Sequence, residues 1–113
     1  MIIGGEDRTV HFGMNTWIEL TQLRGIPMSE LSTVLSSLGD GGGSGAEVRD
    51  LVWASLKCGA LKDRKVFEYT NYDVGFWMDE MNSDELTAFF KELGESMKSR
   101  FPVQKDAKKK VTK

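Results

Sequence analysis

The sequence predicts a mainly α-helical fold, a compact bundle of about five helices with a small N-terminal strand pair. Apolar residues recur at helical spacing in successive segments, which are separated by glycines, prolines or polar runs. The 113 residues, 40% hydrophobic and 28% charged, suffice for one domain with a single modest core. We expect a single helical domain over residues 1–103 and a disordered basic tail over 104–113.

The chain is expected to begin with a strand pair. Ile2 and Ile3 precede the glycines of GGED, and in the following RTVHF segment Val10 and Phe12 alternate with polar neighbours. This alternation is typical of a half-buried strand. A two-stranded hairpin is only marginally stable alone, so we expect it to lie on the helices.

Two short helices with a tight break are predicted next, over about residues 16–24 and over 28–38. Asn15 is a good N-cap for the first helix, Gly25 ends it, and Pro27 suits the first turn of the second. A helix, a glycine turn and a second helix give the outline of a DNA-binding helix-turn-helix.

The composition of the second helix argues against DNA recognition. It contains no arginine, lysine, asparagine or glutamine, the side chains that mainly read bases and bind phosphate, and its one charge is Glu30. Its apolar residues form a stripe instead: Met28, Leu31, Val34, Leu35 and Leu38. We therefore predict a packing hairpin and no nucleic-acid partner.

A glycine-rich loop and a third helix follow. Residues 39–45, GDGGGSG, are expected to be a flexible connection, because a phosphate-binding P-loop would need a preceding strand and a following lysine. A helix is predicted over 46–60 and a polar linker over 61–70. The apolar face of this helix is Val48, Leu51, Val52, Leu56 and Gly59.

Capping signals mark the last two helices. Thr70 and Asp73 resemble a capping box at the start of the fourth helix, and Ser83 is expected to cap the last and longest one. The expected stripes are Val74, Trp77, Met78 and Met81 in the fourth helix, and Leu86, Phe89, Phe90, Leu93 and Met97 in the last.

Few residues offer chemistry. The single histidine, His11, is expected to be a half-exposed strand residue, and the single cysteine, Cys58, a small buried hydrophobe. Neither metal-ligand spacing nor a nucleophile beside a base is present, so we expect no enzyme, no metal and no cofactor.

Charge and hydropathy restrict the partners. Residues 105–113 hold five lysines and one aspartate, a net charge of +4. Because the whole chain has a net charge of −2, the rest of the chain has a net charge of −6. An acidic body repels nucleic acid and anionic lipid, and no apolar run has the length of a membrane span. The N-terminal residues do not resemble a signal peptide. A cytoplasmic protein with no membrane partner is expected, and a lone cysteine suits that compartment.

Three aromatic residues lie off the apolar stripes of their helices: Trp53, Tyr72 and Phe76. One interpretation is that the compact helices are buried on two sides. The other is a protein-binding patch, since tryptophan and tyrosine are favoured interface anchors. These three residues are the candidate protein-binding site.

The order of these features resembles a known family. FGMNTWIELTQLRGIPMSEL is followed by a variable polar loop, EVRDLVWASLKCGAL, a polar break, TNYDVGFWMDEM and ELTAFFKELGESM. This order of segments, over about residues 8–98, resembles that of the tail assembly chaperones of long-tailed bacteriophages and prophages.

The resemblance implies a non-catalytic protein that binds the tape-measure protein, keeps it soluble and helps the tail-tube protein assemble. Family members are mostly helical, tend to self-associate and are often also made in a longer, frameshifted form. The other hypothesis is a small helical regulatory adaptor that binds a single folded protein partner.

Overall fold

The structure, a computed structural model, describes residues 1–39 and 44–100, with side chains up to residue 96. It confirms the mainly helical fold with an N-terminal strand pair. The elements are β1 (Ile2–Ile3), β2 (Glu6–Asp7), α1 (Met14–Arg24), the 3₁₀ helix η1 (Met28–Glu30), α2 (Leu31–Gly39), α3 (Gly45–Lys62), α4 (Asn71–Met78) and α5 (Ser83–Arg100). The predicted tail over 104–113 and most of the predicted glycine loop lie outside the described residues.

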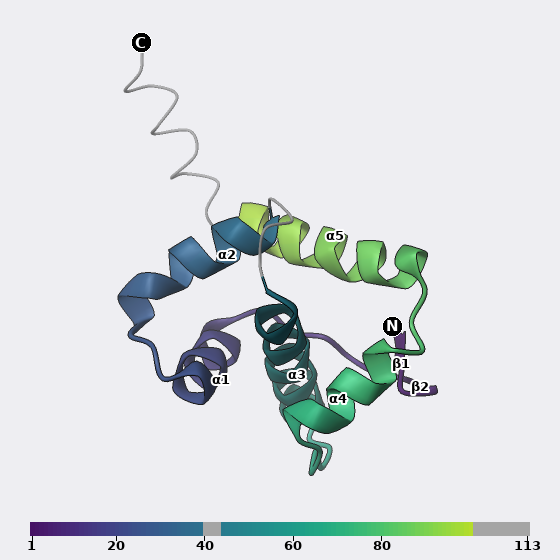
Figure 1. The fold of residues 1–113 in the computed structure, drawn as a ribbon. Helices are drawn as coiled ribbons and strands as arrows, with labels where there is room; N and C mark the ends of the chain where they lie inside the picture. Colours follow the sequence, from purple (N-terminus) through teal and green to yellow (C-terminus); the bar gives the residue numbers. More distant parts are fainter. Residues whose placement is uncertain (40–43, 101–113) are drawn as a thin grey trace.

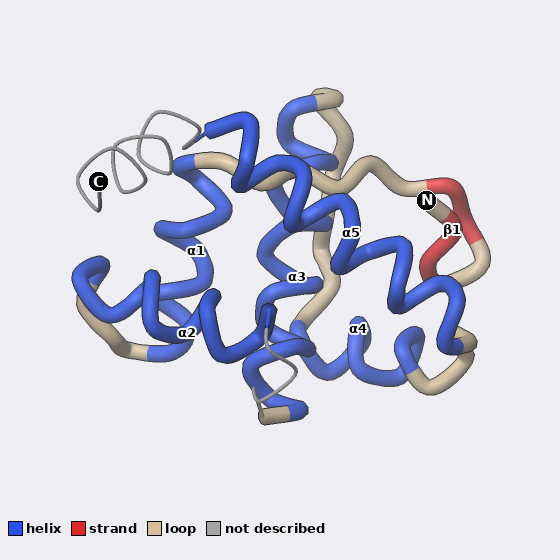
Figure 2. Tube along the Cα trace, turned by 90° about the horizontal axis from the view of Figure 1, so that it is seen from above, coloured by secondary structure: helices blue, strands red, loops and turns tan. Residues whose placement is uncertain are grey.

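The central element is α3, on which α1, α2 and α4 all pack (Figure 1). Seen from above, α5 runs over the bundle from the side of the N-terminal hairpin toward α1 (Figure 2). The hydrophobic core lies between α1, α3, α4 and α5. Its fully buried side chains include Leu20, Leu51, Val52, Leu56, Val74 and Phe89. Burying apolar surface from four helices at once stabilises elements that are individually short.

The N-terminal hairpin is shorter than predicted. Ile2 pairs with Asp7 and Ile3 with Glu6, and the two loop glycines have φ values of +66° and +79°, as a tight two-residue hairpin turn requires. This turn places residues 6–7 opposite β1, so the predicted strand over RTVHF is wrong. That segment instead lies alongside α3 as extended chain, and the His11 N–H donates to the Ser55 carbonyl of α3 at 3.1 Å.

The first helix ends as predicted but begins earlier. Gly25 has a φ of +67° and closes α1 in the left-handed conformation that favours glycine. The N-cap residue is Gly13, so the prediction that Asn15 caps the helix is wrong. The Gly13 N–H is satisfied by Thr16 Oγ1 at 3.3 Å, which allows the helix to start at Met14.

The last two helices begin with reciprocal caps. The predicted capping box of Thr70 and Asp73 is confirmed at α4. At α5 the cap is Asn82 rather than Ser83, because Asn82 Oδ1 accepts the Glu85 N–H at 2.8 Å while Glu85 Oε1 accepts the Asn82 N–H at 2.9 Å. A glutamate three residues after Asn82 completes the box, and none stands three residues after Ser83.

The apolar stripes in the structure differ from the predicted ones in three ways. Met28 belongs to η1 and is exposed, whereas Leu31 and Leu38 of α2 are buried and cover the core as a packing hairpin should. Met81 lies beyond the end of α4, although it still packs against the core. The buried face of α3 is wider than one stripe, because α1 and α4 pack on different sides of it. The side chain of Met97 lies outside the described part.

Candidate protein-binding surface

The outer face of α4 presents two large aromatic side chains. Tyr72 and Phe76 lie one helical turn apart and are 66% and 67% exposed, whereas Val74 between them points into the core and is fully buried. The structure thus brings together two of the three residues that the sequence singled out. Aromatic side chains left in water on an otherwise well-packed helix are typical of an interface.

The Tyr72 ring is held from one side by Arg49 of α3. The guanidinium carbon of Arg49 lies 4.8 Å from the ring centroid, and its Nε donates to Asp50 at 3.1 Å. Gly75 gives the Arg49 side chain room, since a Cβ on Gly75 would lie 3.2 Å from Arg49 Cδ. This cation–π contact orients Tyr72 and leaves its other side accessible.

Asp50 links the helices that support this surface. Its buried carboxylate also accepts hydrogen bonds from Arg24 of α1 at 2.8 Å and from Asn71 of α4 at 3.0 Å. Three helices therefore meet at one carboxylate with several donors, which satisfies a charge that would be costly to bury alone. The start of α4, which carries the aromatic pair, is therefore hydrogen-bonded to the junction with α1 and α3.

Trp53 has different surroundings. Its ring is partly buried against the core, and its indole N–H donates to the Tyr69 carbonyl at 2.9 Å. Lys57 Nζ lies 5.1 Å from the ring centroid and forms an ion pair with Glu19 at 3.0 Å. The indole thus holds the linker that leads into α4, whereas Tyr72 and Phe76 extend away from the core.

A cluster that the sequence analysis missed surrounds Arg8. Its guanidinium lies 4.3 Å from the Trp77 ring centroid and 5.2 Å from that of Tyr69, and these two rings meet edge to face at 4.7 Å. Arg8 also donates to the Ile3 carbonyl at 2.7 Å. The cluster attaches the N-terminal hairpin to α4. The only sequence signal was the density of aromatic residues between 67 and 77.

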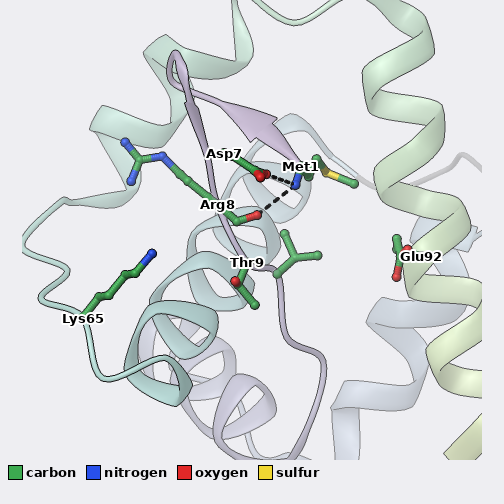
Figure 3. Close-up of a pocket in the computed structure, with 7 residues that line it drawn as sticks. Met1, Asp7, Arg8, Thr9, Lys65 and Glu92 are labelled. Atoms are coloured by element: carbon green, nitrogen blue, oxygen red, sulfur yellow. Dashed lines mark hydrogen bonds and ion pairs between the residues drawn. The ribbon is translucent and has the colours of Figure 1, made fainter.

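A pocket of about 450 Å³ lies beside this hairpin, and Figure 3 shows the side chains that line it. The Met1 amino group binds Asp7 Oδ1 at 2.7 Å and the Arg8 carbonyl at 3.0 Å, and the hydrogen bond lowers the pKa of the Asp7 carboxyl below its ordinary value. Lys65 and Glu92 reach the pocket from the linker and from α5. The contacts of the Met1 amino group hold the two ends of the hairpin together.

The two residues with the most reactive side chains are both at least partly buried. Cys58 is buried as predicted, and burial raises the pKa of its thiol. His11 is partly buried on the extended segment rather than in a strand. Within the described residues, no group of three or more histidine, cysteine, aspartate or glutamate side chains could hold a metal ion.

The fold and this surface define a small helical protein that presents an exposed aromatic pair on a helix anchored through Asp50. Comparison with known proteins gives no match: no protein-family model, no curated protein and no solved structure is similar to the chain. No helix in the described ranges combines the length and apolar character needed to cross a bilayer.

Proposed function

We propose that this protein is a tail assembly chaperone of a long-tailed bacteriophage or prophage. In this proposal it acts in the host cytoplasm without catalysis, binds the tape-measure protein, has the tail-tube protein as a second partner, and self-associates. The sequence resemblance over residues 8–98 suggests the family. The observation that carries the binding role is the exposed pair of Tyr72 and Phe76 on α4.

The binding step follows from the chemistry of that pair. A long helical protein exposes apolar faces before it assembles, and a chaperone keeps it soluble by covering them reversibly. Helices dock through side chains spaced one turn apart, which is the spacing of Tyr72 and Phe76. Aromatic side chains bury a large area with few rotatable bonds, so they lose little entropy on binding.

Co-purification tests this proposal. The tagged protein is co-expressed with the product of the longest helical reading frame beside its gene, and the captured protein is quantified. We expect capture by the wild type and its loss in the double variant Tyr72→Ser/Phe76→Ser. The matched control is Leu61→Ser/Val66→Ser, which removes two exposed apolar side chains elsewhere and should leave capture unchanged.

Two outcomes contradict the proposal. Undiminished capture by the folded Tyr72→Ser/Phe76→Ser variant would place the binding surface elsewhere. Stable capture of one folded host protein, with no binding of the helical neighbour, would instead support the regulatory adaptor.

A further inference from the structure

The exposed aromatic pair is bordered by carboxylates at one end of α4. Asp79 is the C-cap residue of the helix and keeps helical dihedral angles, with φ of −61° and ψ of −24°. It follows Phe76 by three residues and Tyr72 by seven, a spacing that places all three on one side of the helix. Glu80 comes next, and both carboxylates are exposed.

These carboxylates do not stabilise the fold through ion pairs. Within the described residues, neither Asp79 nor Glu80 forms one. Both stand at the C-terminal end of α4, where the helix dipole disfavours negative charge. Residues that break a local rule without a compensating contact are candidates for a functional role.

The charge along this surface is uneven. At the Tyr72 end, Arg49 and Arg24 share the single carboxylate of Asp50, so this end keeps a net positive charge. Residues 71–80, which hold α4 and its C-terminal end, contain three acids and no lysine or arginine: Asp73, Asp79 and Glu80. A ligand that covers Phe76 therefore meets a negative field at the C-terminal end of α4.

We propose that the α4 face accepts an amphipathic helix whose apolar stripe is bordered by lysine or arginine. Its apolar residues cover Tyr72 and Phe76, and its cations face Asp79 and Glu80. This inference rests on the proposed function and adds the chemistry of the occupant. The apolar contact supplies affinity, whereas the charges select the partner and its direction.

Two synthetic helical peptides test the selection. Both have the same leucine face, and the polar face is lysine in one and glutamate in the other. By fluorescence anisotropy we expect the wild type to bind the lysine peptide at least about tenfold more tightly. Asp79→Asn/Glu80→Gln should weaken the lysine peptide about fivefold, with a smaller effect at high salt. The control Glu92→Gln/Glu95→Gln changes the net charge equally on α5 and should have little effect.

Separate outcomes overturn the two proposals. Equal binding of both peptides, or equal weakening by the two double variants, would refute the basic occupant even if Tyr72→Ser/Phe76→Ser abolished capture of the neighbouring gene product. Sedimentation that showed a wild-type dimer dissociated by Phe76→Ser would identify a second copy as the occupant and would also refute it. Persistent capture by Tyr72→Ser/Phe76→Ser would refute the proposed binding site itself.

Discussion

Gly59 of α3 and Thr9 of the extended segment approach so closely that a Cβ on Gly59 would lie 1.9 Å from the Thr9 carbonyl oxygen. The N-terminal segment crosses α3 at this point, one turn beyond the hydrogen bond between His11 and Ser55. Gly59 lies within α3 rather than at its end, so it serves close packing and not helix termination.

Gly59→Ala should therefore destabilise the protein, although alanine is the better helix former. The obstacle is backbone, which cannot rotate away, so we expect a loss of about 2 kcal/mol or more in urea melts followed by circular dichroism. Gly94→Ala is the control, because nothing lies within 4 Å of a Cβ there. It should stabilise α5 by about 0.5–1 kcal/mol. Changes of the same sign in both variants would contradict the close approach.

Arg64 should be replaceable by glycine with a gain in stability. It has a φ of +60° just after α3, where Lys65 N–H donates to the Ala60 carbonyl at 2.8 Å and closes the helix end. The left-handed conformation costs a residue with a Cβ about 1 kcal/mol, and glycine avoids that cost. We expect Arg64→Gly to raise the free energy of unfolding by about that amount. A loss of stability would mean that the arginine side chain makes a larger contribution than its backbone cost.

Removing the Asp50 carboxylate should loosen the junction of α1, α3 and α4. Asp50→Ala leaves the donors of Arg24, Arg49 and Asn71 without their acceptor, so we expect a loss of about 2–3 kcal/mol. Glu68→Ala removes an exposed carboxylate and should change stability by less than about 0.5 kcal/mol. Equal effects of the two variants in thermal melts would contradict the role of Asp50.

The buried thiol of Cys58 predicts a pH effect. Because burial raises its pKa, the folded state keeps this proton at pH values where the unfolded chain has lost it. Stability should therefore fall as the pH rises from the unfolded pKa through the folded one, and Cys58→Ala should lose less stability than the wild type between about pH 8 and pH 10. An identical pH dependence of the two proteins would exclude this contribution.

Local signals predicted the fold better than long-range ones. Gly25 and the pair of Thr70 and Asp73 act within a few residues, so the sequence pattern was sufficient for them. The strand over RTVHF was wrong because alternation describes a half-buried extended segment and does not say what it pairs with. The contact between Gly59 and Thr9 depends on how distant segments meet, and no local pattern encodes that.

The same contrast between local and long-range features holds for the candidate protein-binding surface. Helical spacing was enough to place Tyr72 and Phe76 opposite Val74. The surroundings of Trp53 could not be inferred that way, because its hydrogen-bond acceptor lies in a linker without periodicity. The Arg8 cluster was missed for a related reason, since hairpin and α4 residues become neighbours only after folding.

The last prediction separates Trp53 from the other two candidate residues. Trp53→Ser removes a ring packed on the core and its hydrogen bond to Tyr69, so we expect a loss of about 2 kcal/mol in urea melts. Tyr72→Ser/Phe76→Ser removes two exposed rings and one cation–π contact, so the loss should stay below about 1 kcal/mol. Trp53→Phe is the conservative control, because it keeps apolar contact while losing the donor. If Trp53→Ser left stability unchanged while the double variant unfolded, α4 would contribute its aromatic pair to the core, and the partner-binding surface would have to be sought around Trp53.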